Sequence, residues 1–237
     1  MKLLENHLDL ERFLEYEHAE PIESRSLHFA LQILKPGVDV LDIGGATGIL
    51  LSELLKRSPA NFNAHLLEVD EFYNQRIKDD RIHFIKDSIL KVDEGQHFDI
   101  VFARQMLHHL IGASFGQTKA NQTMALQNLW KLVKPEGYLI IEEVVNNNKL
   151  ASKIIFYGSK IAKLSGLKIK RLELGRLIVC FMSQKELIEA IQSLENANIC
   201  DQQFDEWHFE GLMKATNLMN KVGVLFLAIQ KHRQILT

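Results

Sequence analysis

Short apolar runs alternate with helix-like segments through the first part of the chain. Strand-forming residues fill the runs at residues 36–44, 63–70, 81–88, 97–105 and 138–145. Between the first two runs, residues 48–58 repeat leucines at the spacing of one helix face. A second amphipathic helix is predicted over residues 121–137, where Pro135 and Gly137 end it. Because several runs are apolar on both faces, the alternation predicts a parallel sheet covered by helices on both sides.

The flanking regions predict further helices and one more strand. Residues 3–34 have the pattern of two helices, with Ser24 as a possible N-cap of the second. Ser183 predicts the N-cap of a later helix, and Glu186 completes a capping box with it. The apolar run at residues 223–232 is predicted to be a final strand, which we expect to insert into the main sheet.

Composition excludes several classes of protein. The chain has 237 residues, 46% of them hydrophobic, and a formal net charge of −2. It can therefore build a core, and it offers no global charge for nucleic acid or acidic lipid. Cys180 and Cys200 are too few for a disulfide framework and lack metal-site spacing, so we expect reduced thiols in a cytoplasmic protein. The N-terminal residues carry too many charges for a signal peptide, and no apolar run reaches the roughly 20 residues that cross a bilayer.

The stretch VLDIGGATGIL, residues 40–50, has the pattern of a binding loop. A strand that ends in glycines and opens a helix leaves backbone N–H groups free and allows close approach of another molecule. The spacing of Gly44, Gly45 and Gly48 differs from the dinucleotide fingerprint, and no phosphate-loop lysine follows. Asp42 would repel phosphates, so it suits a ligand that carries a cation. An ordinary glycine turn with a capping Asp is the alternative.

Acidic residues also follow the next two strands. Glu68 and Asp70 end the second strand, where acids commonly hold ribose hydroxyls. Asp87 ends the third strand, where it could accept a hydrogen bond from an amine such as adenine N6. Solvated strand ends and an N-cap are the alternatives for each acid taken singly. Acids at neighbouring strand ends, all facing one glycine loop, are a more specific signal of a nucleoside-like ligand.

These motifs together resemble those of class I S-adenosylmethionine-dependent methyltransferases. The resemblance covers roughly residues 36–146 and, more loosely, residues 180–230. Its motifs are VLDIGGATG, LLEVD, IHFIKDS, FDIVFARQMLHHL and LWKLVKPEGYLIIEE. It implies an α/β fold with a doubly wound, mostly parallel seven-stranded sheet, the Rossmann-like methyltransferase fold, and a helical lid. S-adenosylmethionine would be the cofactor and S-adenosylhomocysteine its product.

Four parts of the chain are expected on this basis. They are an N-terminal helical cap at residues 1–35, a cofactor-binding core at 36–146, a basic amphipathic lid at 147–180, and the C-terminal part of the core sheet at 181–237.

The resemblance also implies roles for the binding loop and the acids. Asp42 would help to fix the ammonium group of the cofactor's methionine end. The loop residues that approach the cofactor would be Gly44, Gly45, Ala46 and Gly48. Glu68 is favoured over Asp70 as the acid for the ribose hydroxyls. Ala46 stands where the family usually has its middle glycine, and binding is expected to survive there if φ stays negative.

Three further residues are assigned on the same basis. Asp87 would accept from the adenine amine, and Ser88 would lie beside the ring. Arg104, just after the fourth strand, would meet the methionine end, although an arginine is unusual there. It could instead pair with the cofactor carboxylate or with an acidic substrate.

The acceptor side of the site is less specified. The methyl donor is already activated, so a general base is needed only for a protonated acceptor. His108 and His109 are the candidates, with a satisfied helix histidine as the preferred interpretation for His108 and both interpretations open for His109. Glu142 and Glu143, at the end of the fifth strand, could also face the acceptor. Tyr16, His18, Phe156 and Tyr157 are candidate lining residues, each with simple packing as the alternative.

Residues 149–176 form a basic and amphipathic stretch in which Glu173 is the lone acid. A lid with a solvated basic side is the simpler interpretation, and contact with an anionic membrane surface or a lipid-like acceptor is the alternative. A nucleic-acid acceptor is disfavoured because aromatic residues are sparse there. We therefore expect a small-molecule methyltransferase acting at oxygen. A methyltransferase-like binding protein that works through a partner, and a nucleotide-dependent oxidoreductase, are the other hypotheses.

Overall fold

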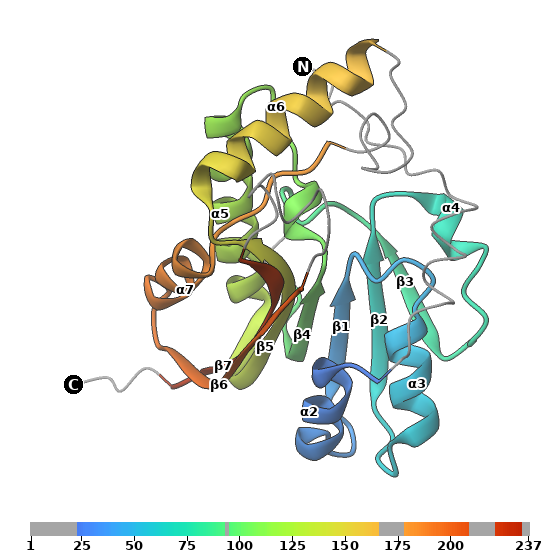
Figure 1. The fold of residues 1–237 in the computed structure, drawn as a ribbon. Coiled ribbons are helices and arrows are strands. Elements are labelled where there is room, and N and C mark those ends of the chain that lie inside the picture. Colours follow the sequence, from blue (N-terminus) through green and yellow to red (C-terminus); the bar gives the residue numbers. More distant parts are fainter. Residues whose placement is uncertain (1–22, 93–94, 166–177, 209–220, 234–237) are drawn as a thin grey trace.

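The computed structural model describes residues 23–92, 95–165, 178–208 and 221–233, which form one seven-stranded sheet with helices on both faces (Figure 1). The strand order is β3-β2-β1-β4-β5-β7-β6. The strands are β1 (Asp39–Ile43), β2 (Asn63–Glu68), β3 (Ile82–Lys86), β4 (Phe98–Arg104), β5 (Val133–Asn146), β6 (Ala197–Glu206) and β7 (Val222–Lys231). β7 lies antiparallel between β5 and β6, and the pairings of β1 to β5 with one another are parallel. The predicted mostly parallel, doubly wound sheet is confirmed, including the insertion of the last strand.

The two faces of the sheet are covered by different helices. α2 (Arg25–Ile33) and α3 (Ile49–Arg57) pack with one set of buried residues, in which Leu27, Leu51 and Leu54 are fully buried. α5 (Phe115–Leu132), α7 (Gln184–Gln192) and the 3-10 turn η1 (Leu107–His109) pack with the other set. Neighbouring residues of β1 point to opposite faces, so Val40 belongs to the first set and Leu41 to the second. The two sets of buried residues therefore form separate layers on the two faces of the sheet.

Helix caps follow the sequence signals closely. Ser24 accepts a hydrogen bond from the backbone N–H of Leu27 and caps α2, as predicted. Ser183 and Glu186 form the predicted capping box at the start of α7. The first of the two helices predicted over residues 3–34 lies outside the described residues, which begin at residue 23.

The helix predicted over residues 121–137 was misplaced at both ends. α5 begins at Phe115, because Ser114 accepts a hydrogen bond from the N–H of Gln117 and caps it. It ends at Leu132, since Val133 already pairs with β4 as the first residue of β5. Pro135 and Gly137 therefore lie inside a strand with an irregular register rather than at a helix end.

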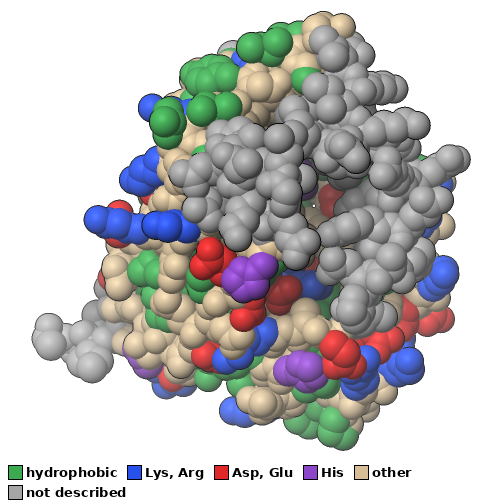
Figure 2. All heavy atoms as spheres, viewed as in Figure 1, with side chains coloured by type: hydrophobic (Ala, Val, Ile, Leu, Met, Phe, Trp, Pro, Cys, Tyr) green, Lys and Arg blue, Asp and Glu red, His purple; other side chains and the backbone are tan. Residues whose placement is uncertain are grey.

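The next two helices lie at the end of the molecule toward which the β1 and β2 arrows point (Figure 1). They are the short α4 (Glu71–Asn74) and the long α6 (Lys149–Ser165). α6 buries Phe156 completely against Ile111, Ile178 and Cys180. Phe156 is thus a packing residue and not a lining residue of an acceptor site. Figure 2 shows hydrophobic side chains at the surface over α6 and the beginning of α5.

Candidate functional site

The carboxyl ends of four neighbouring strands bring the predicted residues together. The backbone N–H of Gly44, after β1, donates to the carbonyl of Leu67 on β2. That of Asp87, after β3, donates to the carbonyl of Glu68. These hydrogen bonds tie the turn after each strand to its neighbour. Ligands of open α/β sheets bind at this edge, so the geometry agrees with the expected location of the site.

The loop after β1 depends on its glycines. Gly44 and Gly48 have φ of 71° and 75°, a region that side chains with a Cβ rarely adopt. Gly48 is the N-cap residue of α3 and donates its N–H to the carbonyl of Gly45. A Cβ on Gly45 would lie 2.1 Å from the Oδ2 atom of Asp42, so the carboxylate of Asp42 sits directly against the loop. Asp42 itself is 1% exposed.

Ala46 contradicts the expected backbone conformation. Its φ is +49°, in the left-handed region, and not negative. An L-residue with a Cβ in that region costs about 1 kcal/mol. The loop therefore keeps the shape that a glycine would give it, and Ala46 carries the strain.

Replacing Ala46 with glycine should raise the free energy of unfolding by about 0.5 kcal/mol, because relief of strain outweighs the added freedom of the unfolded chain. Ala46→Val should lower it by more than about 1 kcal/mol, since β-branched residues disfavour positive φ. Urea denaturation measures both. Ala30→Gly in α2 is the matched control and should destabilise by about 1 kcal/mol, because it places glycine in a helix interior. A loss of stability in Ala46→Gly as large as in this control would contradict the strain.

Glu68 lies under the same loop. Its Oε1 accepts from the N–H of Ala46 at 3.0 Å, and its Oε2 accepts from the N–H of Val69 at 3.2 Å. The side chain is buried, and the pKa of its carboxyl is raised from 4.5 to about 7: burial is the main cause, the hydrogen bonds from Ala46 and Val69 oppose it, and nearby Asp42 and Asp70 add to it. A carboxyl poised in this way can exchange its backbone partners for ligand hydroxyls.

The other predicted acids make local contacts. Asp70 accepts from the N–H of Phe72 at 2.9 Å and caps α4. Asp87 accepts from the N–H of Ser88 at 2.7 Å, and both side chains are half-buried. The hydroxyl of Ser88 accepts from the N–H of Leu90. Both candidate ribose acids thus have backbone partners, and they differ in place: Asp70 caps α4, whereas Glu68 is buried against the glycine loop.

Arg104 is the last residue of β4, and its side chain forms an ion pair with a residue of the neighbouring strand β5. Its Nη2 lies 3.5 Å from the Oε1 of Glu142 on β5. The Oε2 of Glu142 accepts from the backbone N–H and the hydroxyl of Ser26 at 3.2 and 2.5 Å. Glu142 thus joins α2 to the site, a contact that the sequence analysis missed. The Nε of Arg104 is buried and has no hydrogen-bond partner within the described part of the chain.

The two histidines have different surroundings. The Nδ1 of His108 lies 2.5 Å from the Oε1 of Glu143, whose Oε2 accepts from the N–H of Leu107. The ring of His108 also packs on His109 and Phe181. His108 is therefore a satisfied structural residue, the interpretation preferred from sequence, and Glu143 holds η1 onto β5 rather than facing an acceptor.

His109 retains an unused hydrogen-bonding atom. Its Nδ1 is buried and has no partner among the residues that the structure describes. Burial lowers the pKa of its imidazole well below 6.5, so the ring is neutral at neutral pH. Of the two histidines, His109 is therefore the one whose ring nitrogen can accept a hydrogen bond from a bound molecule, whereas the Nδ1 of His108 is already paired with Glu143.

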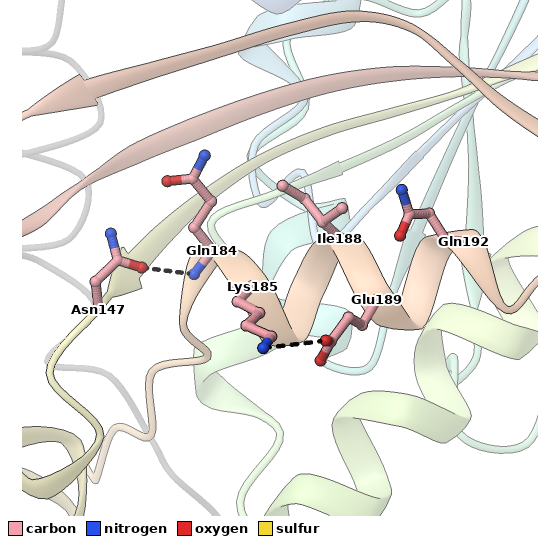
Figure 3. Close-up of a pocket in the computed structure, with 6 residues that line it drawn as sticks. All are labelled: Asn147, Gln184, Lys185, Ile188, Glu189 and Gln192. Atoms are coloured by element: carbon pink, nitrogen blue, oxygen red, sulfur yellow. Dashed lines mark hydrogen bonds and ion pairs between the residues drawn. The ribbon is translucent and has the colours of Figure 1, made fainter.

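A separate surface hollow lies along α7, away from these residues. It is lined by Asn147, Gln184, Lys185, Ile188, Glu189 and Gln192 (Figure 3). The hollow is open, and two local contacts lie in it: Lys185 pairs with Glu189, and the backbone N–H of Gln184 donates to the side chain of Asn147. None of the predicted site residues lines it, so we assign it no function.

Comparison with known proteins identifies the family. The model of a family described as a methyltransferase domain matches residues 11–220. The chain therefore belongs to this methyltransferase family, and the resemblance drawn from its motifs is confirmed.

Individual relatives are distant. The chain is 27% identical over 135 residues to a PKS-NRPS hybrid synthetase, cheA, of Chaetomium globosum, a match that covers 52% of this chain and 3% of that protein. The fold of this chain is similar to that of the Burkholderia thailandensis 1,6-didemethyltoxoflavin-N1-methyltransferase, solved with 1,6-didemethyltoxoflavin and S-adenosylhomocysteine. The TM-score is 0.60 and the identity 14%, and the match covers 94% of this chain and 84% of that one. It is also similar to the [4+2]-cyclase SpnF (TM-score 0.60, 12% identity, 91% and 86%).

Proposed function

We propose that the chain transfers the methyl group of S-adenosylmethionine to an oxygen atom of a small-molecule acceptor. The main observation in favour of this cofactor is a pair of buried acids, Asp42 and Glu68, that lie against the loop after β1. That loop has left-handed φ at Gly44, Ala46 and Gly48. Acids suit an ammonium and ribose hydroxyls, whereas they would repel a pyrophosphate. Family membership and the bound S-adenosylhomocysteine of a structural neighbour support the same cofactor.

In this proposal each residue at the strand ends has a role. Asp42 attracts the ammonium group, and Glu68 leaves the N–H of Ala46 to accept from the ribose hydroxyls. Asp87 and Ser88 flank the adenine. Arg104 either stays paired with Glu142 or turns to a carboxylate of the cofactor or acceptor. The cap formed by Asp70 holds α4 in place.

The chemistry divides between cofactor and protein. The sulfonium of the cofactor supplies an activated methyl group. The protein aligns the acceptor with it and excludes water, and His109 can take the proton of an acceptor hydroxyl through its Nδ1. Oxygen is our proposal because a hydroxyl, unlike a neutral amine, must lose a proton during transfer and so makes use of a base.

Two other functions remain to be tested. A methyltransferase-like protein that acts through a partner is kept open by the strained Ala46 and the Arg104–Glu142 pair. The neighbour described as a [4+2]-cyclase shows that this fold also serves other reactions. A nucleotide-dependent oxidoreductase is disfavoured by Asp42 and by the spacing of Gly44, Gly45 and Gly48.

Calorimetric titration with S-adenosylmethionine, S-adenosylhomocysteine and NADH separates these functions. Micromolar binding of the first two without NADH binding supports the methyltransferase. Binding without turnover over a panel of phenols, alcohols and amines favours the partner-dependent protein, and methylation of amines alone contradicts transfer to oxygen. Binding of NADH alone would favour the oxidoreductase.

Asp42→Asn should weaken the binding of S-adenosylmethionine tenfold or more in the same titration. The substitution keeps the shape of the side chain and removes the charge that attracts the ammonium. Asp205→Asn, on an exposed position of β6, is the matched control and should bind as the wild type does. Equal affinity in Asp42→Asn and the control would mean that Asp42 only supports the loop.

A further inference from the structure

The outward face of α6 carries an apolar stripe. The stripe consists of side chains spaced by four or three residues, which places them on one helix face. They are Leu150, Ile154, Tyr157, Ile161 and Leu164, and their exposed fractions range from 48% to 72%. The opposite face is the buried one, formed by Ala151, Ser152, Phe156, Ser159 and Ala162. The α6 stripe therefore points away from the protein core.

One side of the α6 stripe is basic. The helix sequence holds Lys149, Lys153, Lys160 and Lys163 and has no acidic residue. At 100° per residue Lys149, Lys153 and Lys160 lie between the stripe and the buried face on the same flank, whereas Lys163 lies within the arc of the buried face. Lys149 and Lys153 are exposed, while Lys160 donates to the carbonyl of Ala113 and lies over the ring of Phe156. The helix thus presents apolar side chains bordered by a row of positive charge.

The charge row indicates which partner fits the stripe. In an antiparallel two-fold pairing of α6 with its copy, the two lysine rows would lie on the same side and repel each other. Lys149 lies 3.6 Å from Glu186 of α7, and a purely apolar partner would offer Lys153 no counter-charge. An anionic lipid surface satisfies both features, since its hydrocarbon boundary accepts the stripe and its phosphates attract the lysines. Within the described residues no helix is long and apolar enough to cross a membrane.

We propose that α6 lies flat on an anionic membrane surface, with the α6 stripe in the headgroup boundary and its lysines against lipid phosphates. The helix lies at the end of the molecule where the strands carry the candidate site (Figure 1). Membrane contact would bring the site close to acceptors that partition into lipid. Membrane contact by α6 does not require methyl transfer, so an experiment can refute either proposal without refuting the other.

Vesicle co-sedimentation tests the proposal. The full chain should bind phosphatidylcholine vesicles that contain about one third phosphatidylglycerol at least tenfold more tightly than pure phosphatidylcholine vesicles, and added salt should weaken this binding. The double variant Ile154→Ser/Ile161→Ser should lose about tenfold in affinity, and so should Lys149→Gln/Lys153→Gln. Met124→Ser on α5 and Lys185→Gln on α7 are matched exposed controls and should bind like the wild type.

Three outcomes would overturn the proposal: no binding of the wild type, equal binding to both vesicle types, or equal losses in the controls. A second copy of the chain would be the occupant if the wild type self-associates in sedimentation, without vesicle binding, and the isoleucine variant does not. Calorimetric titration of the isoleucine variant with S-adenosylmethionine should match the wild type. An unchanged cofactor affinity shows that lost vesicle binding reflects the surface and not misfolding.

Discussion

Glu68→Gln should stabilise the ligand-free protein at pH 8 and weaken its binding of S-adenosylmethionine. In the wild type, burial raises the pKa of the Glu68 carboxyl from 4.5 to about 7. The folded protein therefore holds a proton at Glu68 more tightly than the unfolded chain does. The free energy of unfolding consequently falls as the pH rises from 4.5 to about 7. A buried glutamine carries no charge at any of these pH values, so the variant avoids this loss.

The expected gain at pH 8 approaches about 3 kcal/mol, the free energy that corresponds to the pKa change, and should vanish near pH 4. Urea denaturation of both proteins across this pH range measures it. The amide oxygen that replaces the carboxylate in Glu68→Gln can accept from the N–H groups of Ala46 or Val69, which preserves the loop. Cofactor affinity should fall at least tenfold, because an amide is a weaker acceptor for ribose hydroxyls than a carboxylate.

Glu189→Gln on the exposed side of α7 is the matched control and should leave both stability and affinity unchanged. Parallel pH profiles of stability for the wild type and Glu68→Gln would refute the buried charge. Unchanged cofactor affinity in Glu68→Gln, together with a loss of affinity in Asp70→Asn, would mean that Asp70 and not Glu68 binds the ribose hydroxyls. These results would mean that the Glu68 carboxylate lowers the stability of the ligand-free protein and strengthens its binding of the cofactor.

The strand-end acids and caps were predictable because their signals are local. Asp42 and Glu68 lie in the last two residues of β1 and β2, and parallel strands end at one edge of a sheet, so their proximity follows from the fold. Ser24 and Ser183 cap helices through hydrogen bonds to residues three positions on. The φ of Ala46 has no such signal, because the loop shape is set by the glycines beside it and by Asp42 beneath.

Glu142 and Glu143 show a different limit. The sequence analysis offered two interpretations for both residues, facing the acceptor or ending a strand in solvent, yet neighbouring strand residues must point to opposite faces. Glu142 accordingly meets Ser26 of α2, and Glu143 meets His108 of η1 on the other face. Strand periodicity predicts this separation, but it does not predict the partners. Ser26 and Glu142 are 116 positions apart in the sequence, and His108 and Glu143 are 35 positions apart.

Glu143→Ala should lower the free energy of unfolding by about 3 kcal/mol, the typical cost of removing one partner from a buried charged contact. Glu143 is 1% exposed and accepts from the N–H of Leu107 at 2.7 Å and from that of Val144 at 2.8 Å, in addition to its contact with His108. Its loss leaves buried donors without acceptors. Urea denaturation measures the change, and Glu143→Gln should recover part of it because the amide oxygen can still accept.

A double-mutant cycle separates structure from catalysis at the paired histidines. His108→Ala should destabilise the protein, and its effect should overlap with that of Glu143→Ala, giving a coupling free energy above about 1 kcal/mol. His109→Ala should lower the rate of methyl transfer at saturating acceptor, and it should cost stability only through lost packing against His108, because its Nδ1 has no partner among the described residues to lose. Additive effects at His108 and Glu143 would contradict a direct interaction between these two side chains. A loss of turnover in His108→Ala beyond that in His109→Ala would move the base from the second histidine to the first.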